Sequence, residues 1–338
     1  MLERYGIEGA LDRPRERVLG WVARVHEHLM SSSRAHEGAL AEALLERNAR
    51  LDLFYLEGIL KLYKKRYEEL ARHYDVTKRL EDRLGHASAA RGFAREAEER
   101  RLPAAALAWF ADEQERASAA LTATLVDDGW LPEGERVPAL SALVDEVRAL
   151  DWDGYDDDRA FLAKRVAKEL KDIAKADLDL DELQGDVGIH ELRRQLRWVA
   201  IYLTATSGLF TLVDDDPVPE YRALLALPIA KSRYAQLPVS ERERAPLAVS
   251  RSLYVALTKH IEELGAIKDR GERVEAFAQG LMGGGLAQDL EDAERRAIGL
   301  LDEDADAMAR VREDAKRIWA EIQERDLIQA LRKDVKDG

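Results

Sequence analysis

Apolar residues recur every three or four positions over most of this chain, which is the spacing of one buried face of an α-helix. The first two such series are Val18, Trp21, Val22 and Val25, and then Leu53, Leu56, Leu60, Tyr63, Tyr67 and Leu70. Strand-like alternation is nowhere sustained, and the nine prolines leave long stretches uninterrupted. The pattern predicts an all-α helical bundle, with one helix running through 53–70 and another over about 76–101.

Turn-rich stretches divide this helical pattern into parts. The sequences GWLPEGERVP at 129–138 and VDDDPVPEY at 213–221 predict connections, and the glycines of GLMGGGLAQ at 280–288 predict a hinge. The acidic DWDGYDDD at 151–158 is expected to cap the helix that follows it. We therefore expect N-terminal helices in 1–50, a first helical unit in 51–128, a second unit with long insertions in 129–284, and acidic C-terminal helices in 285–338.

Composition narrows the functional classes. The 338 residues carry a formal net charge of -14 and contain no cysteine, which excludes disulfides, thiolate metal sites and cysteine nucleophiles. An acidic chain has no general affinity for nucleic acid, because nonspecific binding requires a basic surface. No apolar run reaches the roughly 18 residues that span a bilayer, and the first residues lack the basic and apolar regions of a signal peptide, so we expect no export signal. We expect a cytoplasmic protein with neither a membrane partner nor specific nucleic-acid binding.

One stretch, GIHELRRQLRW at 188–198, is cationic despite this acidity. At 100° per residue, His190, Arg193, Arg194 and Arg197 share one helix face, and Leu192, Leu196, Val199 and Leu203 lie on the opposite one. Like charges at this spacing repel, so an anion or nearby carboxylates must offset them. Arginine forks pair with phosphate oxygens, which favours a phosphate-rich ligand, and internal carboxylates are the alternative.

The chain also contains an internal repeat. TKRLEDRLG at 77–85 resembles TKHIEELG at 258–265, and each precedes a helical segment with Phe-Ala. A basic stretch lies upstream of each, LKLYKKRYEEL at 60–70 and the cationic helix at 188–198. Two such units indicate a duplication. In the first, Lys64 with Glu68 and Lys65 with Glu69 stand four residues apart, so solvated salt bridges also explain its charge.

These residues resemble the CHAD domain, a helical family named for its histidine. His190, Arg193 and Arg197 match the start of its repeat, with Tyr202 close to the family's aromatic residue. The later segment matches through Leu264, Gly265, Lys268 and Asp269. In the first half, Lys61, Lys64 and Lys65 stand where the family has basic residues. The resemblance implies two pseudo-symmetric helical units, a basic channel and binding of inorganic polyphosphate.

The leading hypothesis is therefore non-enzymatic binding of inorganic polyphosphate, or a related anion, in a basic groove between helices, without a cofactor or a metal. The expected ligand-binding residues are His190, Arg193, Arg194, Arg197, Lys61, Lys64, Lys65, Lys259 and Lys268. The alternative is a protein–protein interaction scaffold in which carboxylates of this chain or of a protein partner neutralise the basic helix. A helical metalloenzyme using His26 and His28 is a more distant alternative, because side chains two residues apart point to different sides of a helix.

Overall fold

The protein is all-α, as predicted. The computed structural model describes residues 5, 13–32, 37–46, 49–184, 187–215 and 218–337. The chain forms two compact units. Unit 1 contains Met1–Tyr155 and Phe277–Ala293, and unit 2 contains Asp156–Ala276 and Glu294–Gly338.

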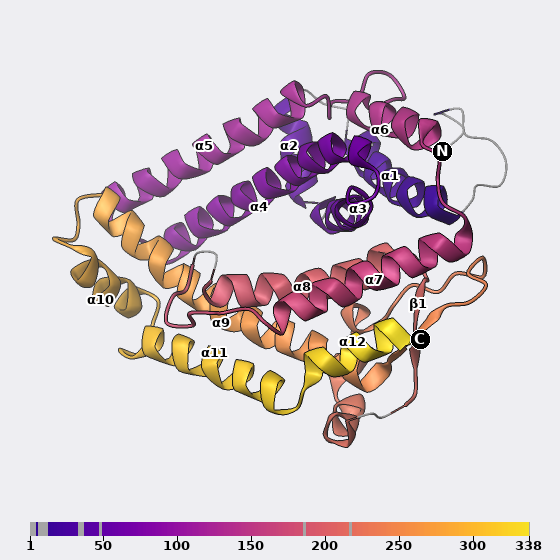
Figure 1. The fold of residues 1–338 in the computed structure, drawn as a ribbon. Helices are drawn as coiled ribbons and strands as arrows, with labels where there is room; N and C mark the ends of the chain where they lie inside the picture. Colours follow the sequence, from indigo (N-terminus) through magenta and orange to yellow (C-terminus); the bar gives the residue numbers. More distant parts are fainter. Residues whose placement is uncertain are drawn as a thin grey trace. The chain divides into compact units, whose positions relative to one another are not determined.

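Unit 1 is built on helices that pack along their lengths. Its elements are α1 (Arg13–Ser32), α2 (Glu37–Glu46), α3 (Ala49–Tyr63), the 3-10 turn η2 (Glu68–Leu70), α4 (Ala71–Glu99), α5 (Ala104–Asp127) and α6 (Pro138–Ala149). The long helices α4 and α5 lie side by side, and α3 packs against both α1 and α4 (Figure 1). Leu56, Leu60 and Tyr63 are fully buried, so the helix-period face of α3 is a core face.

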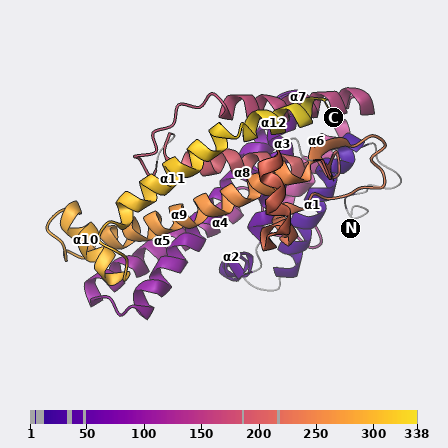
Figure 2. The same cartoon turned by 90° about the horizontal axis from the view of Figure 1, so that it is seen from below.

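Unit 2 is also helical and contains a short strand pair. Its elements are α7 (Tyr155–Ile173), α8 (Ile189–Ala205), β1 (Phe210–Val213), η3 (Pro219–Ala226), η4 (Pro228–Lys231), η5 (Arg233–Ala235), β2 (Leu247–Ser250), α9 (Arg251–Gly283), α10 (Leu290–Leu300), α11 (Ala307–Glu324) and α12 (Leu327–Asp337). The end of α9 and the start of α10 belong to unit 1. The strands pair in parallel with Phe210 opposite Leu247, and four residues are too few for alternation to signal them. Figure 2 shows α8 lying beside α9.

The predicted helix through 53–70 is wrong at its C-terminal end. Helix α3 stops at Tyr63, and a turn leads into η2 and then α4. Asp153 explains the break: it accepts a hydrogen bond from the Tyr67 hydroxyl at 2.9 Å and pairs with Arg66. Trp152 packs its ring against Tyr63 and Tyr67. The aromatic stripe continues into the core, but tertiary contacts bend the backbone that carries it.

Two further predictions have opposite outcomes. The acidic run does begin a helix, because Asp156, Asp157 and Asp158 occupy the first turn of α7. The glycines near 280–285 are not merely a hinge. Helix α9 continues to Gly283, where an added Cβ would lie 2.2 Å from the Trp109 ring. These glycines let the end of α9 approach α5 closely.

The C-terminal helices are part of the packed structure. Val311, Ala315, Ile318, Leu327 and Leu331 are buried, and α12 contacts β2. On α12, Asp334 accepts a hydrogen bond from the Ser250 backbone N–H at 2.8 Å. Within the described ranges, no helix is long and apolar enough to cross a membrane.

The break after α3 gives a testable prediction. Replacing Tyr67→Phe removes the hydroxyl that donates to Asp153 and accepts from its backbone N–H. Because this hydroxyl is largely buried, we expect a loss of about 1–2 kcal/mol in the free energy of unfolding, measured by urea denaturation. The control, Tyr234→Phe, removes an exposed hydroxyl and should change stability by less than about 0.5 kcal/mol. Equal stability of Tyr67→Phe and wild type would contradict the role of Asp153.

Candidate functional site

The cationic face of α8 begins at a tightly built helix N-terminus. The first backbone N–H groups of a helix lack partners within it, and here Ile189 and His190 donate to the carbonyls of Glu182 and Leu183 at 3.0 Å. Gly188 precedes them, and a Cβ at this position would lie 2.5 Å from the Gln184 carbonyl oxygen. The close turn therefore requires glycine, and it fixes where His190 enters the helix.

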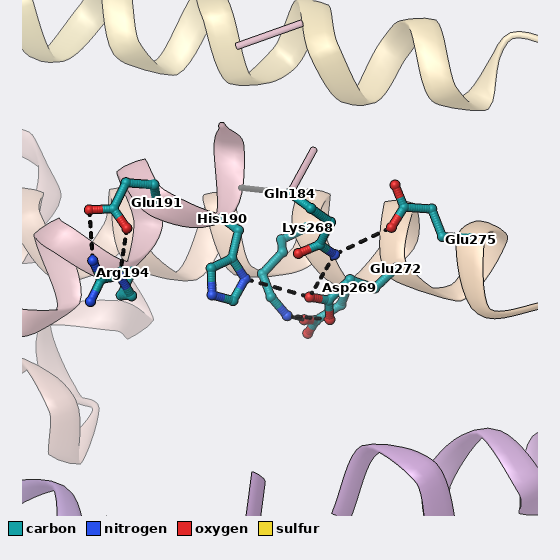
Figure 3. A network of polar contacts seen from close by, with 8 residues as sticks. All are labelled: Gln184, His190, Glu191, Arg194, Lys268, Asp269, Glu272 and Glu275. Carbon is teal, nitrogen blue, oxygen red and sulfur yellow. Dashed lines mark hydrogen bonds and ion pairs between the residues drawn. The ribbon is translucent and has the colours of Figure 1, made fainter. Parts of the chain in front are cut away.

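His190 faces a carboxylate of the next long helix. Its Nδ1 lies 3.6 Å from Oε1 of Glu272 on α9, as Figure 3 shows. The other carboxylate oxygen of Glu272 accepts from Lys268, which also donates to Asp269 at 3.0 Å. Gln184 bridges to this group by donating to Glu272 and Glu275. Two predicted ligand-binding residues, His190 and Lys268, thus share one carboxylate.

Burial alone would raise the pKa of Glu272, because it penalises the charged form. The contacts with His190 and Lys268 outweigh that effect and lower the pKa from 4.5 to about 2. Glu272 is consequently ionised at neutral pH, and its charge stays next to the Lys268 ammonium of α9.

Arg194 is paired within α8 itself. Its Nε and Nη2 donate to the two carboxylate oxygens of Glu191 at 2.5 and 2.9 Å, a bidentate fork that holds the guanidinium in place. Glu191 is buried, with only 7% of its side chain exposed, and it also accepts from Gln195 at 2.7 Å. A third predicted site residue is therefore neutralised by a neighbouring carboxylate.

Arg193 packs onto α9. A Cβ added at Gly265 would lie 3.0 Å from Nε of Arg193, so the guanidinium rests where this helix has no side chain. Unit 1 contains a similar arrangement, because a Cβ added at Gly85 of α4 would collide with the guanidinium of Arg50 on α3. The two glycines are those of the repeated Leu-Gly sequences, so the repeat has a common packing contact. Arg197, one turn beyond Arg193, is half-buried on the same face of α8.

Lys259 belongs to a separate ion-pair group on α9. It donates to Glu263 at 2.9 Å, and Nδ1 of the fully buried His260 lies 3.3 Å from the same carboxylate. Hydrogen bonding to His260 and Lys259 lowers the pKa of Glu263 to about 2 although burial opposes this. Lys259 therefore also stands beside a charged carboxylate.

The lysines of the first half are not arranged on one helix face. Lys61 is half-buried on α3, Lys64 lies in the turn that follows, and Lys65 is exposed there. The predicted pairs of these turn lysines with Glu68 and Glu69 do not form, since the helix has ended. Instead, Lys64 lies 3.2 Å from the Tyr74 ring centroid and 4.0 Å from an oxygen of Asp75.

The first-half lysines belong to unit 1, and His190 with its arginines belongs to unit 2. The histidines considered for a metal have protein partners. His26 contacts the Glu135 carbonyl at 3.1 Å, and His28 contacts Asp52 at 2.8 Å. In the part of the chain that the structure describes, no group of three or more potential ligands could hold a metal ion.

A buried acidic pair in unit 1 was not found from the sequence. Glu57 of α3 is 1% exposed, and Glu81 of α4 is also buried and accepts from Arg50 at 2.5 Å. Burial, and then repulsion from Glu81, raises the pKa of Glu57 to about 8. Both glutamates interrupt apolar stripes, which is the one signal that could have identified them.

Glu57 gives a pH-dependent prediction. Its pKa is raised from 4.5 to about 8 in the folded chain, so the folded state holds this proton more tightly than the unfolded state. The resulting contribution to the free energy of unfolding is fully present below pH 4.5 and is lost as the pH rises through 8. The Glu57→Gln variant mimics the protonated side chain. Its free energy of unfolding should therefore lack the wild-type decline of up to about 1.4 kcal/mol per pH unit. Urea unfolding across this range measures it, with the exposed Glu69→Gln as control. Parallel pH profiles of Glu57→Gln and wild type would refute it.

Comparison with family models, with curated proteins and with solved structures finds no match for this chain.

Proposed function

We propose that this chain is a non-enzymatic helical interaction scaffold, and that the basic face of α8 is neutralised by the chain's own carboxylates. One observation carries the proposal: Glu191 holds Arg194 with both oxygens, and Glu272 is shared by His190 and Lys268. The carboxylates that pair with Arg194 and Lys268 are supplied by α8 and α9 themselves.

The charge balance of this region supports the proposal. A polyphosphate site requires an excess of cations, because each phosphate must be neutralised by the protein. Around the α8 face, Glu191, Asp269 and Glu272 stand at contact distance from the predicted ligand-binding residues. A phosphate polymer would have to displace these carboxylates, and two of them are mostly buried.

The neutralised face has a role in the scaffold itself. The loop before α8 contacts α9 through Gln184, which donates to Glu272. It contacts α11 through Asp181, whose carboxylate pairs with Lys316 at 2.7 Å and whose backbone carbonyl accepts from Arg312 at 2.8 Å. Leu183 of the same loop packs on Gly271. The polar network thereby holds α8, α9 and α11 in register within unit 2.

Binding of inorganic polyphosphate is the second candidate. Two observations favour it: the half-buried row of His190, Arg193, Arg194 and Arg197 on one face, and the duplicated contact of an arginine with the repeat glycine. The second fits the internal duplication that the resemblance to the CHAD domain implies.

A titration with long-chain polyphosphate at low and high salt separates the two candidates, with heparin and single-stranded DNA as controls for general polyanion attraction. For the scaffold, we expect no saturable preference for polyphosphate. The double variant Glu191→Gln, Glu272→Gln should bind more tightly than wild type at low salt, because it uncovers Arg194, His190 and Lys268.

Saturable binding by wild type would contradict the scaffold proposal if two conditions held. The binding would have to be lost in the triple variant that combines His190→Ala, Arg193→Ala and Arg197→Ala. It would also have to be retained in a matched triple variant of α7 that combines Lys164→Ala, Lys168→Ala and Lys171→Ala. Circular dichroism of each variant verifies that the helices remain folded. That outcome would assign the α8 face to polyphosphate.

A further inference from the structure

Helix α7 of unit 2 presents a row of lysines on its outer face. Lys164, Lys168 and Lys171 stand four and three residues apart, so at about 100° per residue they lie on one side of the helix. All three side chains are exposed. The buried residues of the opposite side are Leu162, Val166, Leu170 and Ile173. The apolar side therefore anchors α7, and the lysine row stands on about 10 Å of regular helix.

Most of this row is not neutralised by the chain. Lys164 and Lys171 form no ion pair in the part of the chain that the structure describes. Lys168 pairs with Asp172 at 2.7 Å, but the two side chains are 57% and 55% exposed, so water and salt screen the pair. The α7 row thus differs from α8, where buried carboxylates hold Arg194 and Lys268.

The positive charge is local and has no explanation within the helix. Positions 159–176 contain six basic residues and two acidic ones, in a chain with 52 basic and 66 acidic residues. The helix dipole favours Lys171, which lies in the last turn, but it does not extend to Lys164 two turns earlier. Because like charges at this spacing repel each other, an anion outside the chain would stabilise the row.

The chemistry of the row favours carboxylates over phosphate polymers. Arg165 lies about 100° further round the helix and is paired with Glu169 at 2.9 Å, so the row offers no guanidinium fork for two phosphate oxygens. No aromatic residue occurs from position 162 to 176, so the segment has no ring on which a nucleic-acid base could stack. Each lysine ammonium is a point charge that suits a single carboxylate.

We propose that the lysine row of α7 is a docking face for a protein partner, and that its occupant is an acidic helix with carboxylates spaced as the lysines are. The proposal rests on the scaffold function proposed above and names the surface that binds the partner. Complementary charge of this kind sets the partner's orientation and makes the association sensitive to salt.

Fluorescence anisotropy of a labelled synthetic peptide with the full chain tests this. The peptide is helical and carries glutamates four and three residues apart along one face. We expect saturable binding that weakens as salt is added, and a Kd about tenfold higher or more for the triple variant that combines Lys164→Ala, Lys168→Ala and Lys171→Ala. A peptide of the same composition, with its glutamates spread around the helix, should bind more weakly.

A matched control removes three positive charges that already have partners. Arg91, Arg95 and Arg116 of unit 1 are exposed and stand beside Glu46, Glu99 and Glu113, respectively. Replacing these three arginines by alanine changes the net charge equally and should leave Kd nearly unchanged. Circular dichroism verifies that each variant is folded. Equal Kd values for the α7 variant and wild type, or no binding by wild type at low salt, would overturn the proposal.

Long-chain polyphosphate and single-stranded DNA provide the competing outcome. If either bound more tightly than the peptide, and if that binding were lost in the α7 variant, the row would be a phosphate-binding face and the docking proposal would be wrong. The scaffold function fails on different residues, because it is contradicted by polyphosphate binding that depends on His190, Arg193 and Arg197. The two failures are therefore distinguishable.

Discussion

Unit 2 depends on the pairing of buried or half-buried carboxylates with the cations of α8 and α9. Lys268 is almost fully buried and Glu272 is mostly so, and neither charge could remain there alone, because an unpaired buried charge costs several kcal/mol. Together with Glu191 and Arg194 they let a charged helix face lie against another helix. The apolar face of α8 enters the core through Leu192 and Leu196, while the polar face is fastened by ion pairs.

Glycines make these contacts possible. Gly265 receives the Arg193 guanidinium, Gly271 receives Leu183, and Gly188 allows the preceding loop to reach the helix start. In unit 1, Gly85 receives Arg50 in the same manner. A side chain at Gly265 or Gly85 would displace an arginine, and this explains in physical terms why the repeated sequence ends in Leu-Gly. The repeat is therefore a packing unit, whatever ligand or partner the chain binds.

The sequence was sufficient for features that depend on local periodicity. The all-α class, the two faces of α8 and the acidic first turn of α7 follow from residues within a few turns of each other. The break after Tyr63 could not be predicted, because Tyr67 continues the apolar period and its decisive partner, Asp153, is distant in sequence. The same holds for His190, whose carboxylate is on α9. Ion-pair partners far apart in the chain leave no periodic signal.

The central claim is that Glu191 pairs with Arg194 within α8 itself. The most direct measurement is a double-mutant cycle on the free energy of unfolding with Arg194→Met and Glu191→Gln. The bidentate geometry around a buried carboxylate predicts a coupling of about 1 kcal/mol or more. A coupling indistinguishable from zero would mean that the pair does not form in solution, which would contradict the claim.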